Sequence, residues 1–132
     1  MRALKCMGNT SIFIQRMKTQ LSNQELLAHY QSPDFVLKTQ RQIAKDFGTS
    51  GIDFNKSFEN EELSLTDLLQ ITNEKLEEVL KLGETTTLQL LYQIDIPQSD
   101  FLALTSDPDF IPKMSDLIIR REAYKVYLRS KF

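Results

Sequence analysis

The sequence has one cysteine, one histidine, four glycines and four prolines in 132 residues. Cys6 has no second cysteine for an internal disulfide, and Cys6 with His29 is too small a set for a zinc site. So few glycines and prolines exclude a collagen-like or Pro/Gly-rich disordered chain. No run approaches the roughly 18 uninterrupted apolar residues of a membrane-spanning helix. We therefore expect no cofactor, no metal and no membrane insertion.

The usual signatures of catalysis are missing as well. The sequence has no Gly-x-Ser-x-Gly elbow and no EF-hand spacing, and residues 48–51 lack the Gly-Lys-Ser/Thr ending of a phosphate-binding loop. Ser-His-acid catalysis would need His29, which lies within a predicted helix, where a single histidine is usually structural or solvated. Carboxylates abound, but they fall on predicted solvated faces or at helix starts. We expect no enzymatic activity. Catalysis by a pair of buried carboxylates is kept as a third hypothesis, after protein interaction and nucleic-acid binding.

The composition is that of an ordinary globular domain, with 41% hydrophobic and 26% charged residues. A chain of this length buries enough surface to fold without a metal or disulfide, and it fits one domain best. We predict an all-α fold, a small helical bundle of about five helices over residues 21–132. The default compartment for such a chain is the cytoplasm.

Charge is strongly segregated although the net charge is only −2. Residues 1–45 carry +5, residues 46–112 carry −11 and residues 113–132 carry +4. Oppositely charged segments attract, so the basic C-terminal helix is expected to lie against the acidic middle. The alternative is a basic face for nucleic acid or an acidic partner.

Residues 1–20 are expected to form a flexible or disordered N-terminal extension. They hold four basic residues, no acidic residue and one short apolar run, residues 12–14. That run is too short for a secretory signal. An organellar transit peptide or a start at Met17 are the alternatives.

The ordered part is expected to begin at Ser22, which forms a capping box with Glu25. A second helix is predicted from Pro33 to Phe47, because proline suits the first helical position and Gly48 stands where a helix stop belongs. Residues 48–60 are expected to form a loop anchored by apolar side chains.

The second half of the chain is predicted to hold the most regular helices. Thr66 caps a helix to Leu82 with one apolar arc of about 120°. Residues 85–96 alternate as a strand does, but a strand without partners is not viable, so a helix is favoured. A short helix follows over 97–105, with Asp95 as its cap. The last helix, 112–129, is apolar on two sides and is therefore expected to be sandwiched between other elements or to lie at an intermolecular interface.

These patterns predict a non-enzymatic protein-interaction module or a subunit of a larger assembly, and one hypothesis is a homodimer through residues 113–130. The alternative is a DNA- or RNA-binding protein. Residues 42–50 resemble the centre of a helix-turn-helix, with Ala44 and Gly48 at the motif's spacing, so residues 42–58 are one candidate surface. An ordinary helix end at Gly48 explains the same residues. The other candidate contacts for a partner or nucleic acid are the cations of the last helix: Arg120, Arg121, Lys125, Arg129 and Lys131.

Overall fold

The computed structural model describes residues 21–131, and every regular element in that range is an α-helix. The all-α prediction is confirmed, but the expected count of about five is wrong, because this range holds seven helices. The predicted extension, residues 1–20, lies outside the described residues. The helices are α2 (Asn23–His29), α3 (Pro33–Gly48), α4 (Lys56–Asn60), α5 (Leu65–Lys81), α6 (Glu84–Ile94), α7 (Gln98–Leu104) and α8 (Phe110–Lys131).

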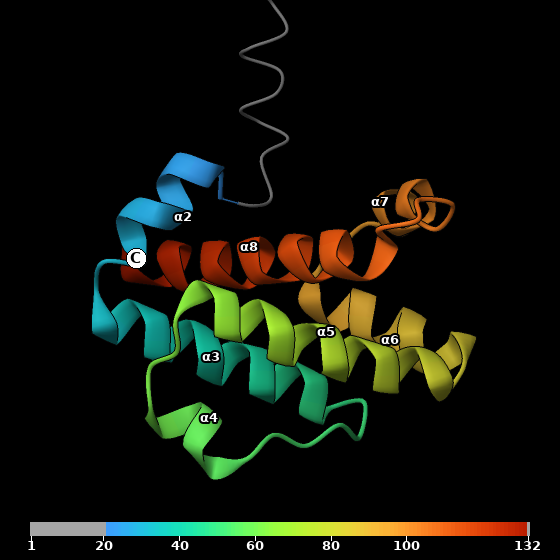
Figure 1. Ribbon diagram of the computed structural model, residues 1–132, viewed down its shortest axis with the longest axis horizontal. Coiled ribbons are helices and arrows are strands. Elements are labelled where there is room, and N and C mark those ends of the chain that lie inside the picture. The colour runs from blue at the N-terminus through green and yellow to red at the C-terminus, as the bar shows by residue number, and fades with distance from the viewer. Residues whose placement is uncertain (1–20, 132) are drawn as a thin grey trace, which may run out of the picture.

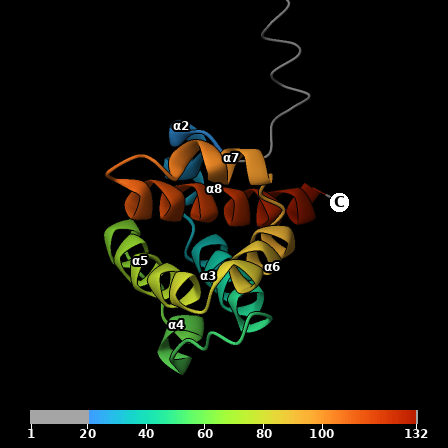
Figure 2. The same ribbon diagram turned by 90° about the vertical axis from the view of Figure 1, so that its right-hand side faces the viewer.

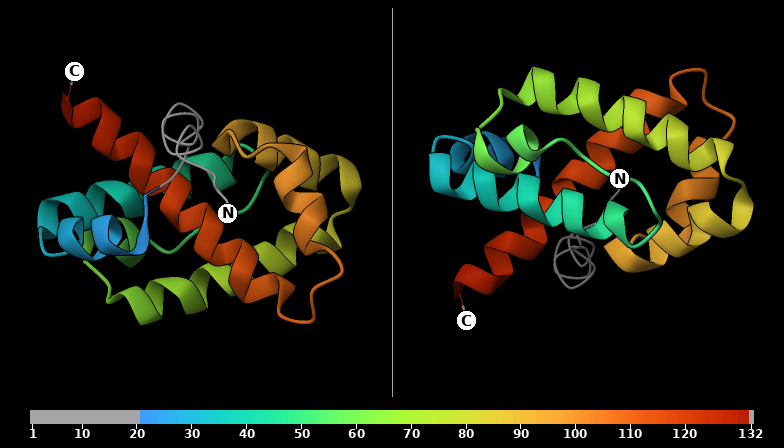
Figure 3. Two further views of the ribbon diagram at one scale, coloured as in Figure 1. Left: turned by 90° about the horizontal axis from the view of Figure 1, so that it is seen from above. Right: turned by 90° about the horizontal axis from the view of Figure 1, so that it is seen from below.

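The long helix α8 lies across a layer made by α3, α5 and α6 (Figure 1). The end-on view shows these three helices on one side of α8, with α4 beneath them (Figure 2). Seen from above, α8 runs obliquely over the layer, and α2 and α7 lie near opposite ends of the molecule (Figure 3). Contacts join α8 to α3, α5, α6 and α7, which confirms its predicted central position.

Both apolar stripes of α8 are used inside the chain. Met114 and Ile118 from one stripe are fully buried, and so are Ile119 and Ala123 from the other. A single helix can bury two opposite sides only when other elements cover both. Four residues from the two stripes are therefore covered by other elements of the same chain.

The helix ends agree with the sequence at some positions and differ at others. The predicted capping box is present, with the Glu25 amide donating to Ser22 Oγ at 3.2 Å and the Ser22 amide donating to Glu25 Oε1 at 3.0 Å. The cap of α5 is Ser64 rather than Thr66, because Ser64 Oγ accepts from the Asp67 amide at 3.1 Å. Ser64 and Thr66 are both residue types that cap helices. The cap is the one whose hydroxyl accepts from a free backbone amide of the first turn, and that residue is Ser64.

Two further boundaries correct the predictions. Helix α3 ends at Gly48, one residue beyond the predicted end, and its C-cap is Thr49, whose hydroxyl donates to the Asp46 carbonyl at 2.6 Å. Asp95 does not cap the helix after it; it ends α6 in the left-handed conformation, with φ 70°. Short polar side chains tolerate this conformation better than most residues, so an aspartate also serves as a helix stop.

Residues 85–96 are mainly helical, as the favoured prediction held. Helix α6 follows Gly83, which has a φ of 110°. Glycine adopts this backbone conformation readily, whereas any other residue would be strained there. The alternating apolar residues that suggested a strand are divided between the core and the surface: Leu90 and Ile94 are buried, whereas Tyr92 is 84% exposed. Helix α6 contacts α3, α5 and α8, so a wide arc of its surface is buried. Apolar residues two positions apart can then lie either inside or outside that arc.

Helix α4 interrupts the segment 48–60, which was predicted to be a loop. Phe58 of α4 is buried in the main core, and its ring lies 4.4 Å from that of Phe54. The fully buried Gln40 holds the end of α4, since its Nε2 donates to the carbonyls of Phe58 at 2.6 Å and Glu61 at 2.9 Å. Its Oε1 accepts from the Leu63 amide at 2.8 Å. The Gln40 side chain therefore forms hydrogen bonds with three backbone groups at the end of α4 and in the loop that follows it.

Replacing Gln40 by leucine is expected to destabilise the protein by about 2 kcal/mol, because three backbone groups lose their partner in a buried place. Urea unfolding followed by circular dichroism measures this loss. The matched control is Gln70→Leu on the exposed face of α5, which should change stability by about 0.5 kcal/mol or less. Equal stability of the two variants would show that Gln40 does not hold α4.

Candidate functional site

The basic residues of the last helix mostly contact groups of the same chain. Arg120 Nε lies 2.8 Å from Asp116 Oδ2, and Arg120 also donates to the side chain of Asn23. Arg121 Nη2 lies 3.3 Å from Asp95 Oδ2, and its Nε donates to the Asp95 carbonyl at 3.2 Å. Asp95 belongs to the acidic middle of the sequence, so the predicted attraction between that segment and the last helix is confirmed here.

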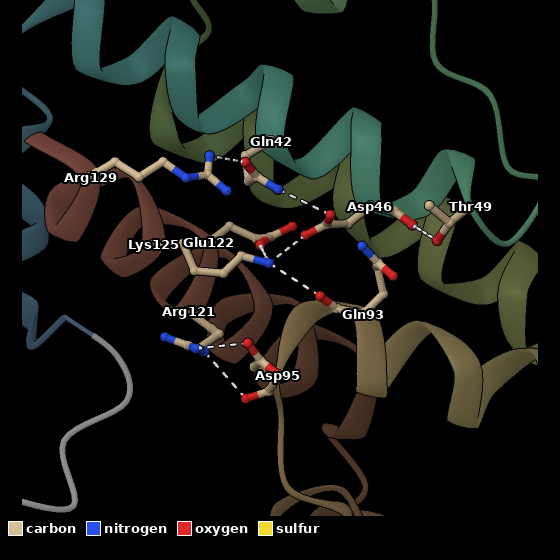
Figure 4. A network of polar contacts seen from close by, with 9 residues as sticks. All are labelled: Gln42, Asp46, Thr49, Gln93, Asp95, Arg121, Glu122, Lys125 and Arg129. Atoms are coloured by element: carbon tan, nitrogen blue, oxygen red, sulfur yellow. Dashed lines mark hydrogen bonds and ion pairs between the residues drawn. The ribbon is translucent and has the colours of Figure 1, made fainter.

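Lys125 lies at the centre of a buried polar network between α3, α6 and α8 (Figure 4). Its Nζ is 2.7 Å from Asp46 Oδ2 and 3.0 Å from Glu122 Oε1, and it donates to the Gln93 carbonyl at 3.2 Å. Asp46 and Glu122 have side chains that are 1% and 0% exposed. The ammonium group of Lys125, whose side chain is 13% exposed, has three oxygen partners, so it is satisfied within the fold and its charge is compensated.

The network continues to the surface through Gln42 and Arg129. Gln42 Nε2 donates to Asp46 Oδ1 at 3.0 Å, and Arg129 Nη1 donates to Gln42 Oε1. Figure 4 shows this row of contacts running along the α3–α8 junction from the buried carboxyl groups to Arg129. Arg129 is therefore anchored by a neutral amide, and this contact does not cancel its charge.

The two carboxyl groups of the network have pKa values shifted in opposite directions. Burial, followed by the neighbouring Asp46, raises the pKa of Glu122 to about 9. Burial also acts to raise the pKa of Asp46, but hydrogen bonds with Glu122, Lys125 and Gln42 outweigh it and lower that pKa. At neutral pH Glu122 is thus protonated, and Lys125 compensates the single remaining negative charge, that of Asp46.

Two carboxyl groups with separated pKa values are what general acid–base catalysis requires. Catalysis also requires contact with a substrate, and both side chains are buried. Neither of them lines the groove described next. The geometry supports a role for this network in joining α8 to α3.

A groove of about 610 Å³ opens between α3 and the C-terminal end of α8. Its polar rim includes three cations of α3, Lys38, Arg41 and Lys45, together with Arg129 of α8. Its apolar part includes Phe35 and Val126, and its remaining lining residues are His29, Ser32, Asp34, Gln42 and Ser130. The volume falls in the range of sites for small ligands or short segments. Four cations and one carboxylate make it a basic concave surface.

Of the five residues predicted as contacts, the structure brings Arg129 alone to the groove. Arg120, Arg121 and Lys125 are engaged elsewhere, and the side chain of Lys131 lies outside the described part of the chain. The sequence reasoning missed the cations of α3. Their spacing of i, i+3 and i+7 places them on one face of a helix, opposite its apolar stripe, and this signal was available.

The segment 42–58 is arranged differently from a helix-turn-helix with a recognition helix. Residues 42–48 complete α3, and the next helix, α4, has five residues, two of which are Lys56 and Glu59. Arg41 Nε donates to the Glu59 carbonyl at 2.8 Å, which ties α4 to α3. A helix this short presents little surface to a nucleic-acid groove, and Glu59 repels phosphate.

Within residues 21–131, no cluster of three or more histidine, cysteine, aspartate or glutamate side chains is placed to hold a metal ion. In the same range, no helix has the length and apolar character needed to cross a bilayer.

Comparison with known proteins found no matching family model, no similar curated protein and no similar solved structure. The side chains of the groove and of the network beside it are therefore the observations from which a function can be inferred.

Proposed function

We propose that residues 21–132 act as a single helical domain, a bundle built around α8, whose function is non-enzymatic protein interaction. The proposed binding surface is the groove between α3 and α8. The observation that supports it is the set of four cations around one concave, partly apolar cavity. Most cations of α8 are compensated within the chain, whereas those of α3 are placed on its rim.

The rim cations have little internal compensation. Lys38 Nζ lies 3.1 Å from Asp34 Oδ2, but both side chains are more than half exposed, so this ion pair contributes little. No residue in the described range forms an ion pair with Lys45, and Arg41 contacts a neutral carbonyl. Uncompensated charges around a concavity favour binding of an oppositely charged partner and speed its association.

Removing the three cations of α3 is expected to abolish partner binding. The groove variant carries Lys38→Gln, Arg41→Gln and Lys45→Gln, and the control variant carries Lys56→Gln, Lys81→Gln and Lys113→Gln. Both lose the same charge, and all six positions are exposed, so both should fold. The full chain, tagged, is used for capture from the source cells with and without nuclease, and the bound proteins are read by mass spectrometry.

The proposal expects proteins that resist nuclease, bind the wild type and the control variant, and are lost from the groove variant. Equal capture by all three forms would contradict it. Partners that vanish with nuclease would instead favour nucleic-acid binding, and the salt dependence of that binding would then be steep.

A further inference from the structure

We propose that the groove between α3 and α8 binds an acidic peptide segment that carries one aromatic or aliphatic anchor residue. This inference rests on the proposed function and names the chemistry of its partner. It follows from an order of side chains along α3: apolar contacts gather at the start of the helix and cations follow toward its end.

The apolar end of the groove is built by a cluster of rings. The His29 ring stacks on Phe35 with centroids 5.0 Å apart, and it lies 4.9 Å from the ring of Tyr127. Val126 is nearly buried beside them, with 6% of its surface exposed. The ring contacts restrict the rotation of these side chains, so the surface that they form is expected to be well ordered. Phe35 and Val126 expose only 9% and 6% of their surfaces, so an apolar side chain of a partner would pack mainly over the half-buried His29 ring, with little loss of order in the groove.

The cationic part begins one helical turn further along. At about 1.5 Å per residue, Lys38, Arg41 and Lys45 lie roughly 5, 9 and 15 Å along the axis from Phe35. An extended peptide advances about 3.3 Å per residue, so acidic residues about two to five positions from the anchor would meet these cations. Arg129 faces them across the groove and is already held by Gln42, which lowers the entropy lost when it binds a carboxylate.

The same surface suits nucleic acid less well. Single strands bind along extended basic surfaces that follow the nucleic-acid backbone, whereas the four cations here surround one concavity of about 610 Å³. A peptide has an apolar side chain to bury in addition to its charge, and it therefore uses both parts of the groove.

The test is fluorescence anisotropy with the full chain and labelled synthetic peptides of about twelve residues. The first peptide holds one phenylalanine followed by a run of glutamates, and the second has these residues in the reverse order, because the chain direction is open. Two controls replace phenylalanine by serine or every glutamate by glutamine. A uridine oligonucleotide of matched charge is the fifth probe.

We expect one acidic peptide to bind, and we expect the groove variant Lys38→Gln, Arg41→Gln, Lys45→Gln to weaken it about tenfold or more, a loss of at least ~1.4 kcal/mol. The control variant should stay within about twofold. The glutamine peptide should lose about tenfold, and the serine peptide about threefold or more. Amide chemical shifts of the wild type should move at Phe35, Gln42 and Arg129, a measurement that needs no variant.

The proposal is overturned if neither acidic peptide binds, if binding is equal in the groove variant, or if the oligonucleotide binds more tightly and through the same cations. If the peptides fail while nuclease-resistant partners are still lost from the groove variant, the groove is a protein interface with another chemistry. In that case the inference fails and the proposed function stands. If those partners are also equal in all forms, both fail.

Discussion

Replacing Lys125 by methionine is expected to destabilise the protein by about 3 kcal/mol, the loss typical when one partner of a buried ion pair is removed. Methionine fills the space of the aliphatic stem but supplies no charge and no donor. Asp46 then keeps a buried negative charge without its cation, and the Gln93 carbonyl loses a hydrogen bond. The helices α3, α6 and α8 meet at this ammonium group, so the loss acts on the whole fold.

A double-mutant cycle with Asp46→Asn separates the charge effect from the packing effect. The free energy of unfolding is measured in urea for both single variants and for the double variant. Asparagine removes the uncompensated charge, so the double variant should recover about 1–2 kcal/mol relative to Lys125→Met alone. The exposed Lys81→Met is the control and should change stability by about 0.5 kcal/mol or less. A change below about 1 kcal/mol in Lys125→Met would show that the network adds no net stability.

Replacing Glu122 by glutamine is expected to stabilise the protein at pH 8 by up to about 5 kcal/mol and to change the shape of its pH dependence. The pKa of Glu122 is raised from 4.5 to about 9 by burial and by Asp46. Between these values the folded chain retains a proton that the unfolded chain releases. Stability from this group is therefore full below pH 4.5, falls by at most about 1.4 kcal/mol per pH unit, and is lost by about pH 9.

Glutamine is neutral at every pH and has nearly the same size and shape as the protonated carboxyl group that it replaces. The two proteins should be nearly equally stable at pH 5 and should diverge as the pH rises. Asp46 has a lowered pKa, so its contribution is present above its ordinary pKa of 3.8 and is lost as the pH falls through its folded value. The variant should keep that acid limb. Urea midpoints from pH 3 to 9 measure both limbs, with the exposed Glu77→Gln as the control. Parallel curves for wild type and Glu122→Gln would contradict the assignment.

The network and the groove are physically joined, because Arg129 reaches both through Gln42. The buried carboxyl groups therefore help to set where the wall of the groove stands. Variants of Lys125 or Glu122 report on stability, whereas variants of the α3 cations report on binding, since those side chains are exposed. The α3 cations can therefore be replaced without removing a member of the network, whereas variants of Lys125 or Glu122 can also act on the groove through Gln42 and Arg129.

The sequence by itself determined the elements with local causes. The capping box at Ser22, the apolar arc of α5 and the end of α5 before Gly83 follow from hydrogen bonds and spacing within a few residues. The two apolar sides of the last helix also predicted that both are covered, but the sequence left open whether other helices or a second molecule cover them. The attraction between the basic C-terminal helix and the acidic middle followed from charge alone.

What the tertiary structure decided depends on residues far apart in the chain. Helix α4 is stabilised because Phe58 packs into the core. Gln40, which lies on α3, also donates hydrogen bonds to the carbonyls of Phe58 and Glu61 at the end of α4. The cations of α8 were predicted to be contacts, but whether a charge faces solvent or a buried carboxylate depends on what α3 and α6 place beside it. The basic groove arises in the same way: a row of cations on α3 becomes a concave site when α8 supplies the second wall. The periodicity of one helix predicts on which face of that helix a side chain lies. Which residue that side chain contacts is decided only by how the helices pack together.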